Sequence, residues 1–264
     1  MTIKFTILGC GSSGGVPRIG NDWGICDPAN PKNRRRRCAI MVEKTSTQGT
    51  TRVIIDTSPD LREQMLSANV NEIDAVWYTH EHADHTHGID ELRVFFLRQR
   101  KPVPIWADAP TADMLMNRFA YCFVSPEGSD YPPIVDHRGI VAGENIRSGG
   151  QGGDITGLPF ELHHGNIAAL GFRIGNVAYT PDVNGVPDSS IAALEGLDVW
   201  VVDALRPKPH PSHFSLPETL AWIERLKPKQ AIITNMHVDM DYETLRQSLP
   251  ANIIPAFDGM TFEA

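Results

Sequence analysis

Four potential metal ligands occur within six residues of this chain, directly after a short apolar segment. Residues 73–79 have the apolar and aromatic composition of a buried strand, and His80-Glu81-His82-Ala83-Asp84-His85 follows them. His80 and His82 alternate, so an extended or turning backbone can direct both rings to one point. Imidazole and carboxylate ligands favour zinc, manganese or iron, and no cysteine lies nearby to close a structural site. The spacing therefore predicts a metal centre in preference to a solvated, His-rich turn.

The pattern of apolar residues predicts an α/β protein. Strands are expected at residues 2–8, 38–42, 51–56, 73–79, 102–106, 158–163, 170–174, 177–180, 198–203 and 230–234, and helices at 61–68, 89–100, 111–123 and 216–226. Residues 125–157 are rich in Gly, Pro and Asp and are expected to be irregular, with one or two short strands. Strands followed by strand–helix alternation, twice over, indicate two packed sheets with helices outside. We therefore expect a four-layer αββα sandwich, formed by residues 1–264 as a single domain.

The composition is that of a soluble protein with a sizeable core, with 41% hydrophobic and 21% charged residues. No apolar run is long enough to cross a bilayer, and the first residues lack the features of a signal peptide. Four cysteines at irregular spacing do not fit a disulfide framework. We therefore expect a cytoplasmic location and no membrane association.

The net charge of −8 argues against an extended nucleic-acid surface, but it leaves room for a small phosphorylated substrate held by a few arginines. The glycine-rich loop at residues 9–17 lacks the Gly-Lys-Ser/Thr ending of a nucleoside-triphosphate loop. The basic run Arg34-Arg35-Arg36-Arg37 is interpreted as a solvated face, which is the usual role of such a run.

Several motifs together resemble one family. They are Gly9-Cys10-Gly11-Ser12-Ser13-Gly14-Gly15-Val16-Pro17, Asn33-Arg34-Arg35, His80-x-His82-x-Asp84-His85, His164-Gly165, Tyr179-Thr180-Pro181-Asp182, Asp203-Ala204-Leu205-Arg206-Pro207 and Asp258-Gly259-Met260. Over nearly its whole length the chain resembles the metallo-β-lactamase superfamily, and more narrowly its PhnP-like phosphodiesterases, whose site is similar to that of RNase Z. The resemblance implies a two-metal hydrolase acting on small or cyclic phosphate diesters.

The resemblance also implies a ligand set for two divalent ions, manganese or zinc. It assigns His80, His82 and His164 to one ion, Asp84, His85 and His237 to the other, and Asp182 to both. A hydroxide shared by the two ions would attack the phosphorus, and Asp84 is expected to act in catalysis as well as in binding. Two positions stay open, because His163 competes with His164, and Asn235 stands directly after Thr234, where many relatives have the ligand histidine.

The segment at residues 203–213 is expected to bind and protonate the substrate. Arg206 and His210 are the predicted substrate contacts, and His213 is the predicted general acid, with a helix cap as its alternative role. Many relatives have a cysteine cluster after the first strand that binds an accessory zinc. Only Cys26 stands in that loop here, so we expect no such zinc.

Other functions remain open at this stage. On the same fold they are an RNA-processing nuclease similar to RNase Z and a thioester hydrolase, and outside catalysis a metal-dependent binding protein. The expected partner is a small phosphorylated molecule such as a nucleotide, and a homodimer is compatible with the sequence.

Overall fold

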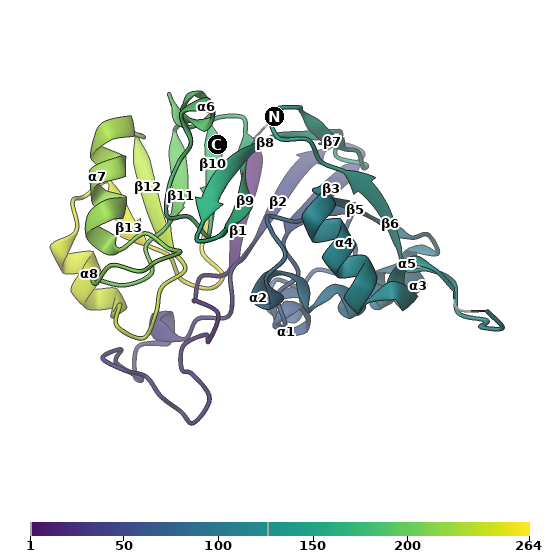
Figure 1. Cartoon of the computed structure of the whole chain (residues 1–264), viewed down its shortest axis with the longest axis horizontal. Coiled ribbons are helices and arrows are strands. Elements are labelled where there is room, and N and C mark those ends of the chain that lie inside the picture. Colours follow the sequence, from purple (N-terminus) through teal and green to yellow (C-terminus); the bar gives the residue numbers. More distant parts are fainter. Residues whose placement is uncertain (1, 126) are drawn as a thin grey trace.

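The computed structural model describes residues 2–125 and 127–264, which form two seven-stranded sheets packed face to face (Figure 1). Helices lie on the outer side of each sheet, so the predicted αββα sandwich is confirmed. The largest hydrophobic cluster joins residues of both sheets, including Phe5 and Ile55 from the first and Phe172 and Val201 from the second.

The first sheet has the strand order β14-β1-β2-β3-β4-β5-β6. Its strands are β1 (Ile3–Gly9), β2 (Ala39–Ser46), β3 (Gly49–Ile55), β4 (Ala75–Trp77), β5 (Val103–Ala107), β6 (Val135–Gly139) and β14 (Thr261–Glu263). The helices in this half are α1 (Leu61–Ser67), α2 (Ala83–Thr86), α3 (Leu92–Gln99), α4 (Ala109–Arg118) and α5 (Ala120–Phe123), with short 3-10 helices at Pro31–Asn33 and Ile89–Glu91. A second hydrophobic cluster fills the space between this sheet and its helices.

The second sheet has the order β13-β12-β11-β10-β9-β8-β7. Its strands are β7 (Ile146–Ser148), β8 (Ile155–His164), β9 (Ile167–Ile174), β10 (Val177–Thr180), β11 (Val199–Asp203), β12 (Gln230–Thr234) and β13 (Ile253–Pro255). The helices here are α6 (Asp188–Ile191), α7 (Leu216–Leu226) and α8 (Tyr242–Ser248), with a 3-10 helix at Ala192–Leu194. Among the helices of the described residues, none is long and apolar enough to span a bilayer.

Helix α7 shows how local sequence fixes an element. Ser215 caps its start, the Glu218 carboxylate accepts a hydrogen bond from the Ser215 backbone N–H at 2.8 Å, and Pro217 stands in the first turn. Lys227 ends the helix in the left-handed conformation, with φ 51°. These signals explain why the predicted bounds agree with the structure.

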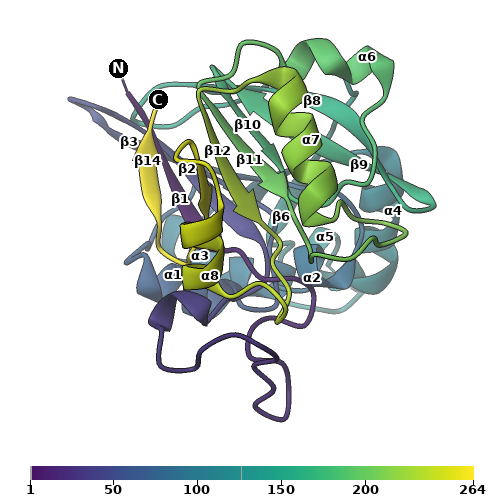
Figure 2. The ribbon, with the colours of Figure 1, turned by 90° about the vertical axis from the view of Figure 1, so that its left-hand side faces the viewer.

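The structure departs from the predicted elements in two regions. The single helix predicted at residues 111–123 is two helices, α4 and α5, because Phe119 leaves the helical region at φ −128°. The elements after β12 were not predicted, although β14 pairs antiparallel with β1 and brings the two chain ends together (Figure 2).

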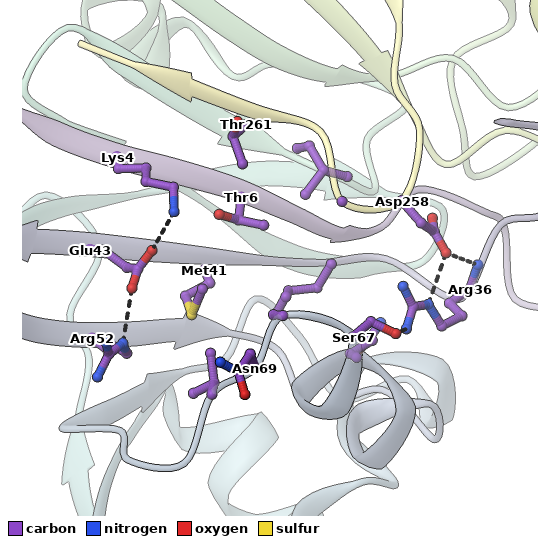
Figure 3. Close-up of a pocket in the computed structure, with 16 residues that line it drawn as sticks. Lys4, Thr6, Arg36, Met41, Glu43, Arg52, Ser67, Asn69, Asp258 and Thr261 are labelled. Atoms are coloured by element: carbon purple, nitrogen blue, oxygen red, sulfur yellow. Dashed lines mark hydrogen bonds and ion pairs between the residues drawn. The ribbon is translucent and has the colours of Figure 1, made fainter.

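The interpretation of the arginine run as a solvated face is wrong for three of its four residues, because only Arg34 is exposed. Arg35 is only 2% exposed and donates to the Met240 carbonyl at 2.6 Å. Arg36 pairs with the Asp258 carboxylate at 2.9 Å, as Figure 3 shows, and Arg37 pairs with Asp60 at 3.2 Å. These partners lie on distant segments, so the sequence run gave no sign that the arginines are structural.

The cavity drawn in Figure 3 lies on the side of the first sheet that faces α1 and has a volume of about 540 Å³. Glu43 pairs with both Lys4 at 3.2 Å and Arg52 at 2.9 Å, and Arg36 is held by Asp258. Its three cations, Lys4, Arg36 and Arg52, outnumber its two carboxylates by one, but each of them already contacts a carboxylate. None of the predicted site residues lines it.

Candidate metal centre

The predicted ligands meet where several strands of the two sheets end. Strands β10, β11 and β12 are parallel neighbours, so their carboxyl ends lie along one edge of the second sheet. The loop after β4, with helix α2, lies at the lower edge of the sandwich in Figure 1. Loops at the carboxyl ends of parallel strands commonly form ligand sites, because several segments converge there without belonging to the sheet itself.

The first ligand group combines three imidazoles and one carboxylate. One ligand atom from each of its members lies within 4.8 Å of the others, and the members are His80, His82, His164 and Asp182. His82 Nδ1 and His164 Nε2 are 3.1 Å apart. His164 Nδ1 donates to the Ser212 carbonyl at 2.6 Å, which fixes the ring so that Nε2 faces the group.

The structure brings His164 rather than its neighbour into the group. His164 is buried and His163 is exposed, because successive strand residues face opposite sides. Gly165 follows with φ 62°, a conformation that favours glycine, and turns β8 into β9.

The second ligand group has three members, Asp84, His85 and Asp182. His85 Nε2 lies 3.2 Å from Asp182 Oδ1 and 3.6 Å from Asp84 Oδ2. The other oxygen of Asp182, Oδ2, lies 3.7 Å from His80 Nε2. Asp182 therefore presents one carboxylate oxygen to each group, as expected of a bridging ligand.

Asp56 supports the second group from behind, although no sequence motif assigned it a role. Its carboxylate is fully buried, accepts from both the N–H and the hydroxyl of Thr79 at 2.8 Å, and lies 2.7 Å from His85 Nδ1. This bond directs His85 Nε2 toward Asp182. The signal in the sequence was an aspartate directly after β3; its backbone has φ 69°, which an aspartate tolerates better than most residues.

The residues present fit a divalent cation. His80 Nε2 and His85 Nε2 are buried and have no hydrogen-bond partner within the described residues, so each keeps a lone pair or a proton unsatisfied. Burial lowers the pKa of His80 and lowers the pKa of His164 to about 4. Both rings are therefore neutral at pH 7, which is the form that binds metal.

The prediction that His237 completes the second group differs from the structure. Its Nε2 lies 3.2 Å from the Arg18 guanidinium and its Nδ1 lies 3.1 Å from the Asp239 carboxylate. Asn235 stands in the vicinity instead, buried, with Nδ2 donating to Asp182 Oδ1 at 3.1 Å. His237 follows Asn235 by two residues in the same turn. The left-handed backbone at Asn235, with φ 59°, directs its side-chain amide toward Asp182.

His213 lies beside the first group and is held by a carboxylate. Its Nδ1 is 2.8 Å from Asp203 Oδ2, and its ring packs edge-on against His164 with centroids 4.7 Å apart. Burial alone would lower the pKa of His213, but the Asp203 carboxylate outweighs this effect and raises the pKa to about 9. Asp203 is fully buried and also accepts from the Val183 N–H at 3.1 Å, so its position is fixed.

The two predicted substrate contacts lie in the same loop but are placed differently. The His210 ring is 5.1 Å from the His213 ring, at the rim of the centre. The Arg206 guanidinium donates to the carbonyls of Lys208 and Pro209, at 3.3 and 2.9 Å. Arg206 therefore shapes this loop, and its role as a substrate contact stays a prediction.

Cys26 has protein partners in place of a metal. Its thiol donates to the Val238 carbonyl at 3.3 Å, and all four cysteines are free and buried. Burial raises the pKa of Cys26, so the group is a thiol and not a thiolate at neutral pH.

Comparison with known proteins identifies the fold and the family. Residues 51–236 match the family described as Beta-lactamase superfamily domain. The crystal structure of a new diphosphatase from the PhnP family is 37% identical and has a TM-score of 0.89, with 100% of this chain and 98% of that chain covered. The Zn(2+)-bound PqqB of Methylobacterium extorquens has a TM-score of 0.76 over 99% of this chain and all of that one, but its 16% identity shows the fold alone.

A curated relative, named octanoyltransferase, from Porphyromonas gingivalis is 28% identical over 263 residues. The alignment covers 98% of this chain, but the chain spans only about half (51%) of that relative's length. The fold, the His/Asp metal site and the similarity to the diphosphatase together support a metal-dependent hydrolase. The chain belongs to the β-lactamase superfamily and, within it, to the PhnP family.

Proposed function

We propose that the protein is a metal-dependent phosphodiesterase that hydrolyses small or cyclic phosphate diesters. The observation that carries this proposal is His213, which Asp203 holds at 2.8 Å beside the ligand His164. A leaving alkoxide needs a proton as its bond to phosphorus breaks, and a histidine next to the metal ligands is placed to supply it.

A divalent ion bound by these ligands supplies Lewis-acid stabilisation of the phosphoryl oxygens and lowers the pKa of a water molecule. The chain's own residues then do three things. The ligand histidines and Asp182 define where the phosphate lies, and Asp203 holds His213 Nδ1. His213 Nε2 is thereby left as the nitrogen that faces the leaving oxygen and donates its proton.

The loop of His210 and Arg206 forms one side of the substrate space. The ring centroids of His210 and His213 are 5.1 Å apart, and His213 packs against the ligand His164 at 4.7 Å. A diester bound at the metal ligands could therefore also contact these two rings. A small substrate also suits the acidic chain, because a long polyanion would be repelled by a net charge of −8. We place RNA processing below small diesters for this reason.

A second candidate is hydrolysis of a phosphoanhydride, because the similar PhnP-family protein is named a diphosphatase. Both reactions break a P–O bond and use the same ligands, but a phosphate leaving group needs a proton much less than an alkoxide does. The role of His213 therefore separates the two.

The test is a substrate panel with metal-loaded protein. It contains bis(p-nitrophenyl) phosphate, cyclic nucleotides, a cyclic ribose phosphate, a dinucleoside diphosphate, a short RNA and an octanoyl thioester. We expect the highest kcat/KM with a small or cyclic diester. Preference for the anhydride would support the second candidate, and preference for RNA or the thioester would overturn the proposal.

His213→Ala sharpens this test, with the exposed His163→Ala as the matched control. We expect kcat to fall by about 10²–10⁴ with an alkyl leaving group, the usual contribution of a positioned acid. The loss should be much smaller with p-nitrophenolate, which leaves without a proton. Equal losses with both leaving groups, or metal loss from the variant, would show that His213 positions the substrate or supports the site instead.

A further inference from the structure

The two ligand groups are unequal. The first has four members, three imidazole nitrogens and one carboxylate oxygen, which is the number of ligands that zinc usually takes. The second has three members, one imidazole nitrogen and two carboxylate oxygens, and it shares Asp182 with the first. An ion held by the second group would therefore need a fourth ligand from outside these three residues.

Asn235 contacts the carboxylate that the two groups share, and its Nδ2 lies 3.1 Å from His213 Nδ1. It is 2% exposed, and its Nδ2 donates to Asp182 Oδ1 at 3.1 Å, the same oxygen that lies 3.2 Å from His85 Nε2. The protein therefore already provides a hydrogen-bond donor to the oxygen that a second ion would use. The amide could offer its own oxygen only by turning over, which would break this bond to a buried carboxylate.

His237 does not fill the gap. Arg18 and Asp239 contact its two ring nitrogens at 3.2 and 3.1 Å, and its side chain is 22% exposed. To ligate, the ring would have to leave both partners.

The donor atoms of the two groups also favour different ions. Imidazole suits zinc, whereas carboxylate and carbonyl oxygens suit manganese and magnesium. Most sites bind zinc more tightly than manganese. The two groups are therefore expected to differ in the ratio of their zinc affinity to their manganese affinity.

We infer that this chain binds one ion tightly at His80, His82, His164 and Asp182, and a second, exchangeable ion at Asp84, His85 and Asp182. The second site discriminates less strongly against manganese than the first does, and Asn235 sets this difference. The inference concerns the metal centre alone and is independent of which substrate is cleaved.

The experiment measures metal without measuring activity. Full-length protein is loaded with Zn²⁺ or Mn²⁺, passed over a chelating resin and analysed for metal per chain, and each ion is also titrated calorimetrically. Wild type should retain about one ion, with the second bound at least about 10²-fold more weakly, since one ligand of four is missing. The zinc-over-manganese affinity ratio should be smaller for the second ion than for the first.

Two variants test the residues involved. Asn235→His should raise the second affinity and the zinc-over-manganese ratio, so that about two ions are retained. His237→Ala is the matched control and should leave both affinities unchanged. Two ions of equal affinity in wild type, or loss of the second ion in His237→Ala, would overturn the inference. Those two measurements remain decisive if the Asn235 variant fails to fold.

Discussion

The turn after β4 and the turn after β12 start alike and end differently. In the first, Thr79 precedes His80, and in the second, Thr234 precedes Asn235. Each turn also contains a histidine paired with an aspartate through Nδ1. The His85–Asp56 pair is fully buried at 2.7 Å, whereas the His237–Asp239 pair is partly exposed at 3.1 Å.

The difference shows what turns a histidine into a metal ligand. Asp56 lies behind His85 and leaves its Nε2 directed at two carboxylates, with no hydrogen-bond partner among the described residues. Asp239 lies two residues from His237 in the same turn, while Arg18 approaches the other ring nitrogen. The Asp56–His85 pair orients a metal ligand. The Asp239–His237 pair, together with Arg18, connects the turn to the N-terminal loop.

The strongest test of the comparison removes the residue shared by both groups. Asp182→Ala should lose at least one ion and lower kcat/KM by about 10³-fold or more, because metal stabilisation of the transition state contributes several kcal/mol. Metal analysis and kinetics measure this, with circular dichroism to confirm folding. Asp198→Ala, a surface aspartate paired with Lys229, is the control and should behave as wild type. Full metal content in Asp182→Ala would contradict the assignment.

A smaller effect is expected from the aspartates behind the two histidines. Asp56→Asn should weaken metal binding by about 10–100-fold, the usual effect of removing the partner of a ligand histidine. Asp239→Asn should leave it unchanged, because His237 is outside both ligand groups. Parallel calorimetric titrations of the two variants check this, and equal losses would remove the distinction between the turns.

The same contrast explains what the sequence could predict. His80, His82, Asp84 and His85 are close in sequence, and their spacing alone indicated a metal site. Asp56 and Asp203 act through contacts 29 and 10 residues away, which depend on how the strands pair.

The turn after β12 was harder still. Its sequence showed that Asn235 stands where a ligand was expected, but which side chain faces the centre depends on the left-handed backbone at Asn235. The strand and helix pattern was sufficient for the αββα sandwich, because apolar periodicity is set locally. The short final strand β14 has only partners at the other end of the chain and gave no comparable signal.

A third prediction concerns how the second turn is held without metal. Asp241 Oδ2 accepts from Asn33 Nδ2 at 2.7 Å, and Oδ1 accepts from the Thr244 N–H at the start of α8. Asp241→Asn places an amide N–H against one of these donors, so we expect a loss of about 1–2 kcal/mol in the free energy of unfolding at pH 7. Urea denaturation with metal in excess measures it.

This loss should depend on pH in a definite direction. Partial burial raises the pKa of Asp241, but hydrogen bonds from Thr244, Asp27 and Asn33 outweigh it and lower the pKa to about 2. The unfolded value is about 3.9, so the contribution is complete above about pH 4 and is lost as the pH falls toward 2. The gap between wild type and variant should narrow over that range, and a gap that widened would have the wrong sign.

The smallest effect is expected at Cys26, which fastens the N-terminal loop to the second turn. Its thiol donates to the Val238 carbonyl at 3.3 Å, and a serine hydroxyl can make the same bond. A metal would need the thiolate, but burial raises the pKa of Cys26 and keeps the proton on sulfur. Arg35 lies 3.8 Å from the sulfur, where its positive charge would oppose a cation.

Cys26→Ser should therefore leave metal content unchanged and cost at most about 1 kcal/mol of stability. Metal analysis of both proteins decides the matter, because a third, tightly held zinc that disappears in Cys26→Ser would mean that a metal, and not this hydrogen bond, fastens the turn.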